Sequence, residues 1–178
     1  MKAHFAQFAA YNRWANARLC QAAFALGEED YRRDVGAFFK SMHGTLNHLL
    51  VADRIWLKRL TGEGDHPNRL DAILHEDRRA LALARADEDD RLARYVGSLD
   101  DVALEGVLEY ATTSGKPFAQ KRREILAHLF NHQTHHRGQA HAILSIVTGR
   151  EPPSLDLLLW QRSGPAPDLR ALAAGTAG

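Results

Sequence analysis

Two histidines one helical turn apart are the residues of this chain whose types and spacing most directly indicate chemistry. His132 and His136 belong to an apolar stripe that otherwise contains Ile125, Leu129, Ala140, Ile143 and Val147. An i, i+4 pair lies on one helix face with Cβ atoms about 5–6 Å apart, so both imidazoles can reach one ion at about 2.0–2.1 Å. Two imidazoles buried without partners would each cost about 1–3 kcal/mol. Metal ligation, or hydrogen bonds to carbonyls and polar partners such as Asn12, would offset that cost.

A third ligand would have to come from another segment, because a protein metal site usually has at least three protein ligands. His48 and His43 both flank the apolar stripe of residues 39–60, and periodicity does not choose between them. Asp53 is a candidate carboxylate ligand or an acceptor for an imidazole N–H, and equally a partner for Arg54 or for another helix. These alternatives stay open at the level of the residues.

The other histidines between residues 128 and 141 lie off the stripe, and we interpret them as surface groups or as hydrogen-bond partners of ligands. They are His128, His135 and His141. Three histidines without a fourth protein ligand form the open arrangement of catalytic sites, in which water or substrate takes the last position. Imidazole ligands alone suit zinc, nickel, copper or iron. The pattern therefore predicts a class of site and does not name the metal.

Four amphipathic segments would position these residues. Apolar residues recur at three- and four-residue steps over residues 3–26, 39–60, 70–99 and 120–148, which predicts four long helices. Asn12 stands on the first of these stripes and therefore needs a buried partner. The acidic run at residues 87–91 is interpreted as a solvated helix face or a local break.

Long helices with almost no strand favour an all-α fold, specifically an antiparallel four-helix bundle. Weak alternation over residues 104–110 and a turn signal at 113–117 mark a candidate small hairpin before the last long helix. We expect one domain over residues 1–165 and a frayed tail over residues 166–178.

The composition excludes several classes of protein. The chain has 178 residues, of which 45% are apolar and 25% charged, as in ordinary globular domains. Lys and Arg number 23 against 22 Asp and Glu, which argues against generic nucleic-acid binding even at the basic residues 121–123. The single cysteine, Cys20, cannot form an internal disulfide or a CxxC pair. Without an apolar signal core or about 18 consecutive apolar residues, we expect a cytoplasmic protein with no membrane segment.

Three segments of the chain resemble the DinB/YfiT-like family of four-helix-bundle proteins. They read YNRWAN over residues 11–16, LNHLLVADRIW over 46–56 and FNHQTHHRGQ over 130–139, with a weaker match at PP, residues 152–153, and DLL, residues 156–158. The resemblance implies a histidine triad of His48, His132 and His136 that binds a divalent metal, which decides between His48 and His43. It also implies homodimers, often isolated with nickel or zinc, and thiol-dependent transferases or isomerases that use low-molecular-weight thiols.

Three functions compete under this resemblance. A metal-dependent hydrolase or thiol S-transferase would activate water or a small thiol toward a small-molecule substrate. Arg137 could then orient an anionic substrate, or it could form a salt bridge or lie on the helix surface. Asn12 and Gln139 are candidate polar groups of the pocket, and equally could form hydrogen bonds within the bundle. The rivals are a non-catalytic metal-binding stress-response protein and a helical dimerisation module. An enzyme needs an open coordination position, whereas a structural metal site needs a fourth protein ligand.

Overall fold

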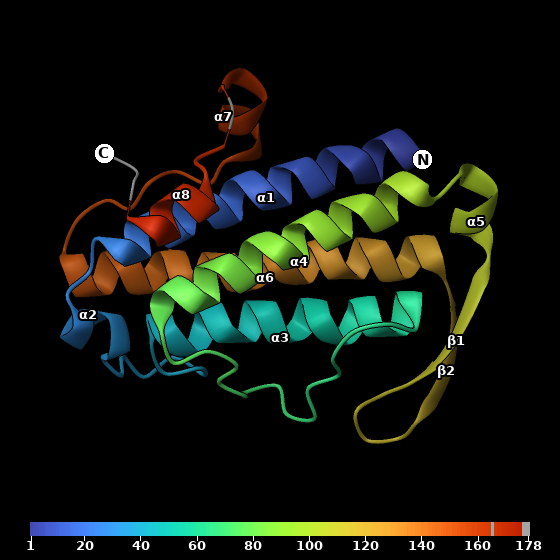
Figure 1. Cartoon of the computed structure of the whole chain (residues 1–178), viewed down its shortest axis with the longest axis horizontal. Coiled ribbons are helices and arrows are strands. Elements are labelled where there is room, and N and C mark those ends of the chain that lie inside the picture. Colours follow the sequence, from blue (N-terminus) through green and yellow to red (C-terminus); the bar gives the residue numbers. More distant parts are fainter. Residues whose placement is uncertain (165, 176–178) are drawn as a thin grey trace.

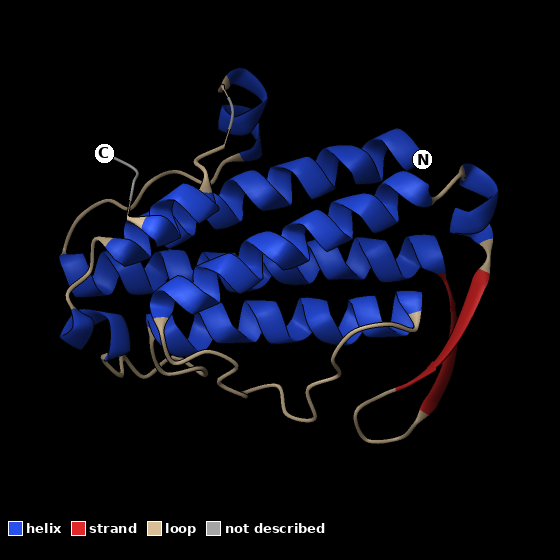
Figure 2. Cartoon of the chain, viewed as in Figure 1, coloured by secondary structure: helices blue, strands red, loops and turns tan. Residues whose placement is uncertain are grey.

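The computed structural model describes residues 1–164 and 166–175 and is mainly helical, with one small sheet (Figure 2). The helices are α1 (Lys2–Phe24), α2 (Glu28–Arg32), α3 (Met42–Thr61), α4 (Arg78–Ser98), α5 (Asp101–Glu105), α6 (Arg122–Thr148), α7 (Leu157–Arg162) and α8 (Leu169–Ala174). The expected hairpin is confirmed as strands β1 (Val107–Ala111) and β2 (Pro117–Lys121), which pair antiparallel with Tyr110 opposite Phe118. Within the described residues, no helix combines the length and the apolarity needed to cross a bilayer.

Two apolar clusters fix the directions of the four long helices, which lie side by side (Figure 1). The first cluster joins the C-terminal halves of α1 and α6 to the N-terminal halves of α3 and α4, and includes Leu19, Met42, Leu81 and Leu144. The second joins the opposite halves, and includes Phe5, Leu57, Leu92 and Leu126. Helices α1 and α6 therefore run one way, and α3 and α4 run the other.

This arrangement departs from the expected antiparallel order of successive helices. Because α3 and α4 run in the same direction, residues 62–77 must travel back along the length of the helices, as the green trace beside α3 shows (Figure 1). The helix expected over residues 70–99 accordingly begins only at Arg78, where the Asp77 side chain accepts the Ala80 N–H at 2.8 Å. The residues before Asp77 belong to this connection, which we call the crossover segment (residues 62–77).

Glycines end two of the long helices. Gly62 after α3 and Gly149 after α6 both have left-handed backbone conformations, with φ of 78° and 62°. Gly149 directly follows the helix expected over residues 120–148. Gly27 directly follows the helix expected over residues 3–26, but α1 already ends at Phe24. Gly27 instead precedes α2, because the acidic residues after it begin a short helix.

The C-terminal part differs from the frayed tail expected over residues 166–178. Residues 169–174 form α8, which packs against α4 and buries Leu169 and Ala173. The Asp168 side chain caps this helix by accepting the Arg170 N–H at 2.8 Å. Residues 176–178 of the expected tail lie outside the described residues.

A layer of buried polar side chains lies between the two apolar clusters, at the middle of the four long helices. Its members are Asn12, Asn16, Asp53, Arg85, Asp89, Gln133 and Arg137. Arg85 of α4 forms ion pairs with Asp53 of α3 at 2.7 Å and with Asp89 at 3.1 Å. Asp89, in the acidic run interpreted as solvated, is only 2% exposed, so that interpretation is wrong for this residue.

Asn12 finds within this layer the buried partner that its position on the stripe requires. The side-chain amides of Asn12 and Asn16 donate to Asp89 Oδ1 at 3.2 and 2.9 Å. Their carbonyl oxygens accept from the guanidinium of Arg137 on α6. The layer thereby links α1, α4 and α6 through one hydrogen-bond network and sets their register.

Candidate metal centre

Three histidines from α3 and α6 converge on one point of the structure. The nitrogen atoms that His48, His132 and His136 can offer as ligands all lie within 4.8 Å of one another. The ring centroids of His48 and His132 lie 4.3 Å from that of His136 in each case, and 5.3 Å from each other. The i, i+4 pair on α6 thus faces His48 across the α3–α6 contact. We call these three residues the histidine cluster.

Only one of the two ring nitrogens of His48 has a hydrogen-bond partner among the described residues. Its Nδ1 lies 2.8 Å from the carbonyl oxygen of Leu70 in the crossover segment. Because a carbonyl only accepts, Nδ1 carries the proton and Nε2 keeps its lone pair. Nε2 is buried and has no hydrogen-bond partner among the described residues. Burial lowers the pKa of His48 to about 4, so its imidazole is neutral at pH 7.

His136 is oriented in the same way by a side chain of its own helix. Its Nδ1 lies 2.7 Å from Oε1 of Gln139, whose amide nitrogen lies 3.3 Å from Nε2 of His135. Burial lowers the pKa of His136, and burial together with the neighbouring imidazoles lowers that of His132 to about 3. An acceptor at the nitrogen that faces away from the ion is the usual support for a metal-binding histidine.

An aromatic ring covers one side of the cluster. Phe39, just before α3, stacks on His48 with a centroid distance of 3.7 Å and an interplanar angle of 16°, and it meets His136 edge-on at 5.5 Å. The backbone reaches this position by a turn at Lys40, which has φ of 66°. Ser41 then caps α3 by accepting the Gly44 N–H at 3.1 Å. Periodicity places Phe39 and Leu70 at the start of the helices expected over residues 39–60 and 70–99, but α3 begins at Met42 and α4 at Arg78. Both residues lie in irregular segments, so the pattern gave no indication of the contacts they make with His48.

Gly44 is required by the close approach of the residue 39 backbone. A Cβ at this position would lie 2.1 Å from the carbonyl oxygen of Phe39. We expect Gly44→Ala to displace the Phe39 ring from His48 and to lower the free energy of unfolding by about 1–3 kcal/mol. Urea denaturation measures this change. The matched control is Gly97→Ala in α4, where nothing lies within 4 Å of the new Cβ and the change is expected to be neutral or stabilising. Equal effects of the two substitutions would contradict the prediction.

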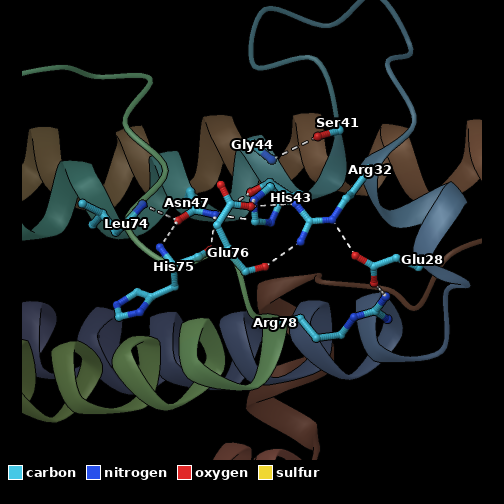
Figure 3. Close-up of polar contacts among 10 residues, drawn as sticks. All are labelled: Glu28, Arg32, Ser41, His43, Gly44, Asn47, Leu74, His75, Glu76 and Arg78. Atoms are coloured by element: carbon cyan, nitrogen blue, oxygen red, sulfur yellow. Dashed lines mark hydrogen bonds and ion pairs between the residues drawn. The ribbon is translucent and has the colours of Figure 1, made fainter.

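His43, the other candidate from the same segment, lies in a separate polar cluster (Figure 3). Its Nε2 lies 3.4 Å from the carboxylate of Glu76, which also accepts from Arg32 at 2.9 Å. The His43 ring packs edge-on against Tyr31 with a centroid distance of 5.4 Å. The structure therefore separates His43 from the histidine cluster and places His48 within it.

The same polar cluster fixes the crossover segment to α3. The Asn47 side-chain oxygen accepts the backbone N–H groups of Leu74 and His75 at 2.8 and 3.0 Å, and its amide donates to the His75 carbonyl at 3.2 Å (Figure 3). Asn47 is fully buried and is the neighbour of His48 in sequence. Its three contacts hold the chain that carries the Leu70 carbonyl against the helix that carries His48.

The remaining carboxylate candidate, Asp53, lies outside the cluster. Its two oxygens contact Arg85 at 2.7 Å and the Gln133 amide at 2.6 Å. Among the alternatives considered for Asp53, the structure therefore shows a partner for other helices, and neither Arg54 nor a histidine is its contact. Burial raises the pKa of this carboxyl.

The candidate catalytic residues separate into two groups. Gln139 contacts His136, whereas Arg137 and Asn12 contact each other in the buried polar layer. Of the histidines interpreted as surface groups, His128 and His135 are exposed, and His141 Nε2 lies 3.2 Å from the Pro153 carbonyl.

The metal-free protein is expected to lose stability as the pH falls below about 6.5. Histidines of the unfolded chain titrate near 6.5, whereas burial keeps His48 and His132 neutral in the fold until about pH 4 and about pH 3. Between these values the two histidines bind more protons in the unfolded chain than in the fold, so their contribution to the free energy of unfolding falls with pH, and above about pH 7 this contribution no longer changes. Burial raises the pKa of Asp53 to about 6, which opposes part of the fall below about pH 6, but one carboxyl group does not cancel two imidazoles. Urea unfolding between pH 7 and 5 should show a shallower dependence in His132→Gln. Identical slopes would contradict this assignment.

The fold and the histidine cluster define a mainly helical protein in which three imidazoles from two helices lie close enough together to hold one metal ion. The chain belongs to the DinB family, whose family model matches residues 1–168. It is also similar to Protein DinB of Bacillus subtilis (strain 168), with 25% identity over 150 residues that cover 75% of this chain and 80% of the relative. The family indicated by the three motifs is thus confirmed.

Proposed function

We propose that this chain is a divalent-metal-binding protein in which His48, His132 and His136 hold the ion. The observation that carries the proposal is the convergence of three neutral imidazoles, one of which has a buried and unpartnered Nε2. An unsatisfied buried acceptor is costly, and an ion at this point would offset the cost. The group consists of histidines alone among the described residues, so three protein ligands would leave a coordination position for water or a small molecule.

We further propose an enzyme that activates water or a low-molecular-weight thiol for hydrolysis or S-transfer. When bound, a zinc or nickel ion supplies a Lewis acid that lowers the pKa of such a ligand. The protein residues have separate tasks. The Leu70 carbonyl and Gln139 keep the proton on Nδ1 of two ligands, and Phe39 shields one face of His48 from water.

The metal content of untagged protein tests the first proposal. Mass spectrometry is expected to find close to one divalent ion per chain, and chelated protein is expected to take up zinc or cobalt(II) again with the same stoichiometry. A tag would add ligands of its own and is therefore omitted. Metal-free protein that cannot be reloaded would overturn the metal-binding proposal.

The absorption spectrum of the cobalt(II) protein tests the open position. Addition of a small thiol is expected to change the visible spectrum, because the thiol enters the coordination sphere beside the three imidazoles. An unchanged spectrum would instead identify a closed site, as in a non-catalytic metal-binding protein. The two experiments therefore separate metal binding from the presence of an open coordination position.

A further inference from the structure

A strip of aromatic and basic side chains continues the histidine cluster along α3 and α6 toward the hairpin. The ring of His128, one turn before His132, lies 5.7 Å from the His132 ring and 5.1 Å from that of Trp56. The Arg59 guanidinium lies over Trp56 and over Tyr110 of β1, at 4.6 and 5.2 Å from the ring centroids. The rings thus form an unbroken series of contacts from the histidine cluster to Arg59.

The Arg59 guanidinium has no counter-charge among the residues that the structure describes. No hydrogen bond or ion pair joins it to any residue in the described part of the chain, and its Nε is buried without a partner. Burial lowers the pKa of Arg59, and the Tyr110 phenol only partly opposes this. Two other half-buried arginines differ: Arg91 pairs with Glu88 at 2.8 Å, and Arg54 pairs with Asp65 at 3.3 Å. A partly desolvated cation without a partner is costly unless an anion joins it.

The two terminal guanidinium nitrogens of Arg59 are positioned to bind a carboxylate. Its two terminal nitrogens are absent from the buried unpartnered atoms, so they reach solvent while Nε does not. Trp56 and Tyr110 hold the plane of the guanidinium, which leaves the end-on pair of N–H donors in fixed positions. Such a pair matches the two oxygens of a carboxylate in a bidentate, charge-assisted contact.

The position of Arg59 on α3 sets the length of the ligand. Arg59 and His48 lie on the same face, about three turns or 16 Å apart along the helix axis. The Arg59 side chain points back over Trp56, toward the histidines, which shortens this separation. A molecule that contacts both ends must therefore be elongated, with the carboxylate remote from the group that reaches the histidine cluster.

We propose that Arg59 binds the carboxylate of an elongated small-molecule ligand whose opposite end lies at the histidine cluster. The inference rests on the proposed function for the chemistry of that opposite end. It assigns Arg59 a role in binding, and none in the reacting centre.

A series of mercaptocarboxylates of increasing chain length tests the proposal on the cobalt(II) protein. The visible spectrum reports the thiol end, and the NMR signals of the Arg59 side-chain Nε–H and the Trp56 indole N–H report the carboxylate end in the same titration. Mercaptopropionate is too short to span the two ends, whereas mercaptooctanoate and mercaptoundecanoate approach the required length. Mercaptooctanol and mercaptoundecanol are the matched neutral thiols.

The spanning acids are expected to bind about tenfold more tightly than their alcohols, and mercaptopropionate is expected to show no such preference. Arg59→Gln should abolish the preference and leave the affinity for the alcohols unchanged. Arg59→Lys should keep only part of the preference for the acids, because an ammonium keeps the charge but lacks the planar pair of donors. Lys58→Gln, the same loss of charge one position away on a different face of α3, should leave the preference intact.

Equal affinities for acids and alcohols, or a preference that persists in Arg59→Gln, would overturn the proposal while the metal centre stands. If the protein takes up no cobalt, the proposed function fails, but the NMR titration with octanoate still decides this inference. A shift of the Arg59 signal, together with a shift of the Trp56 signal that is absent in Arg59→Gln, would support carboxylate binding at Arg59. Absence of both shifts in the unmodified protein would overturn it.

Discussion

His48→Ala is expected to lose its metal ion under conditions in which the unmodified protein retains about one ion per chain. The substitution removes one of the three imidazoles of the histidine cluster, and the one whose Nε2 is buried without a partner among the described residues. Substitution of a residue that merely supports a ligand already costs about 10–100-fold in metal affinity, so removal of the ligand should cost more. Competition with a chromophoric chelator, followed by mass spectrometry of the dialysed protein, measures the loss.

His43→Ala is the matched control for this experiment. Both histidines are buried near the start of α3, but His43 contacts Glu76 and Tyr31 instead of the cluster. The control should therefore keep its metal even if it unfolds at a lower urea concentration. Helix content measured by circular dichroism checks that both variants stay folded. Equal metal loss in the two variants would contradict the assignment of His48.

Arg85→Met is expected to lower the free energy of unfolding by about 3–5 kcal/mol. Arg85 forms ion pairs with Asp53 and Asp89, and all three side chains are almost completely buried. Methionine fills a similar volume but removes the ion-pair partner of two buried carboxyl groups, so each must either protonate or stay charged and unpaired. Urea denaturation at pH 7 measures the difference.

Arg170→Met serves as the exposed counterpart. Arg170 also pairs with two aspartates of α4, Asp87 at 2.6 Å and Asp90 at 2.7 Å, but its side chain is 47% exposed. Water screens these pairs, so their loss is expected to change stability by no more than about 1 kcal/mol. A small effect at Arg85, comparable to that at Arg170, would show that the buried layer contributes little to stability.

The regular parts of this protein were predictable because each follows from a local pattern. The spacing of apolar residues indicated the long helices, and the same periodicity placed His132 and His136 on one inward face. Asn12 was identified as a buried polar residue by the same reasoning. Periodicity alone left His48 and His43 equivalent, since both flank one stripe, and the family resemblance was needed to separate them.

The remaining features depend on contacts between distant segments, which a local pattern does not contain. The acidic run of α4 was interpreted as solvated because its charges give no inward stripe, yet Asp89 is buried by partners on α1 and by Arg85. The crossover segment was assigned partly to a helix, since Leu70 and Leu74 resemble a continuing stripe. Its path is set instead by Asn47, which binds its backbone from α3.

The parallel course of α3 and α4 has a consequence for how this fold tolerates insertions and deletions. The 20-residue α3 is about 30 Å long, a distance that about nine fully extended residues would span. Residues 62–77 form a longer segment than this distance requires. The additional residues allow the chain to bend toward the helices, so that the Leu70 carbonyl oxygen lies 2.8 Å from His48 Nδ1. Shortening the segment toward its minimum would still connect the helices but would straighten this bend. The length of this solvent-facing connection, and not only its sequence, therefore determines whether the Leu70 carbonyl can orient His48.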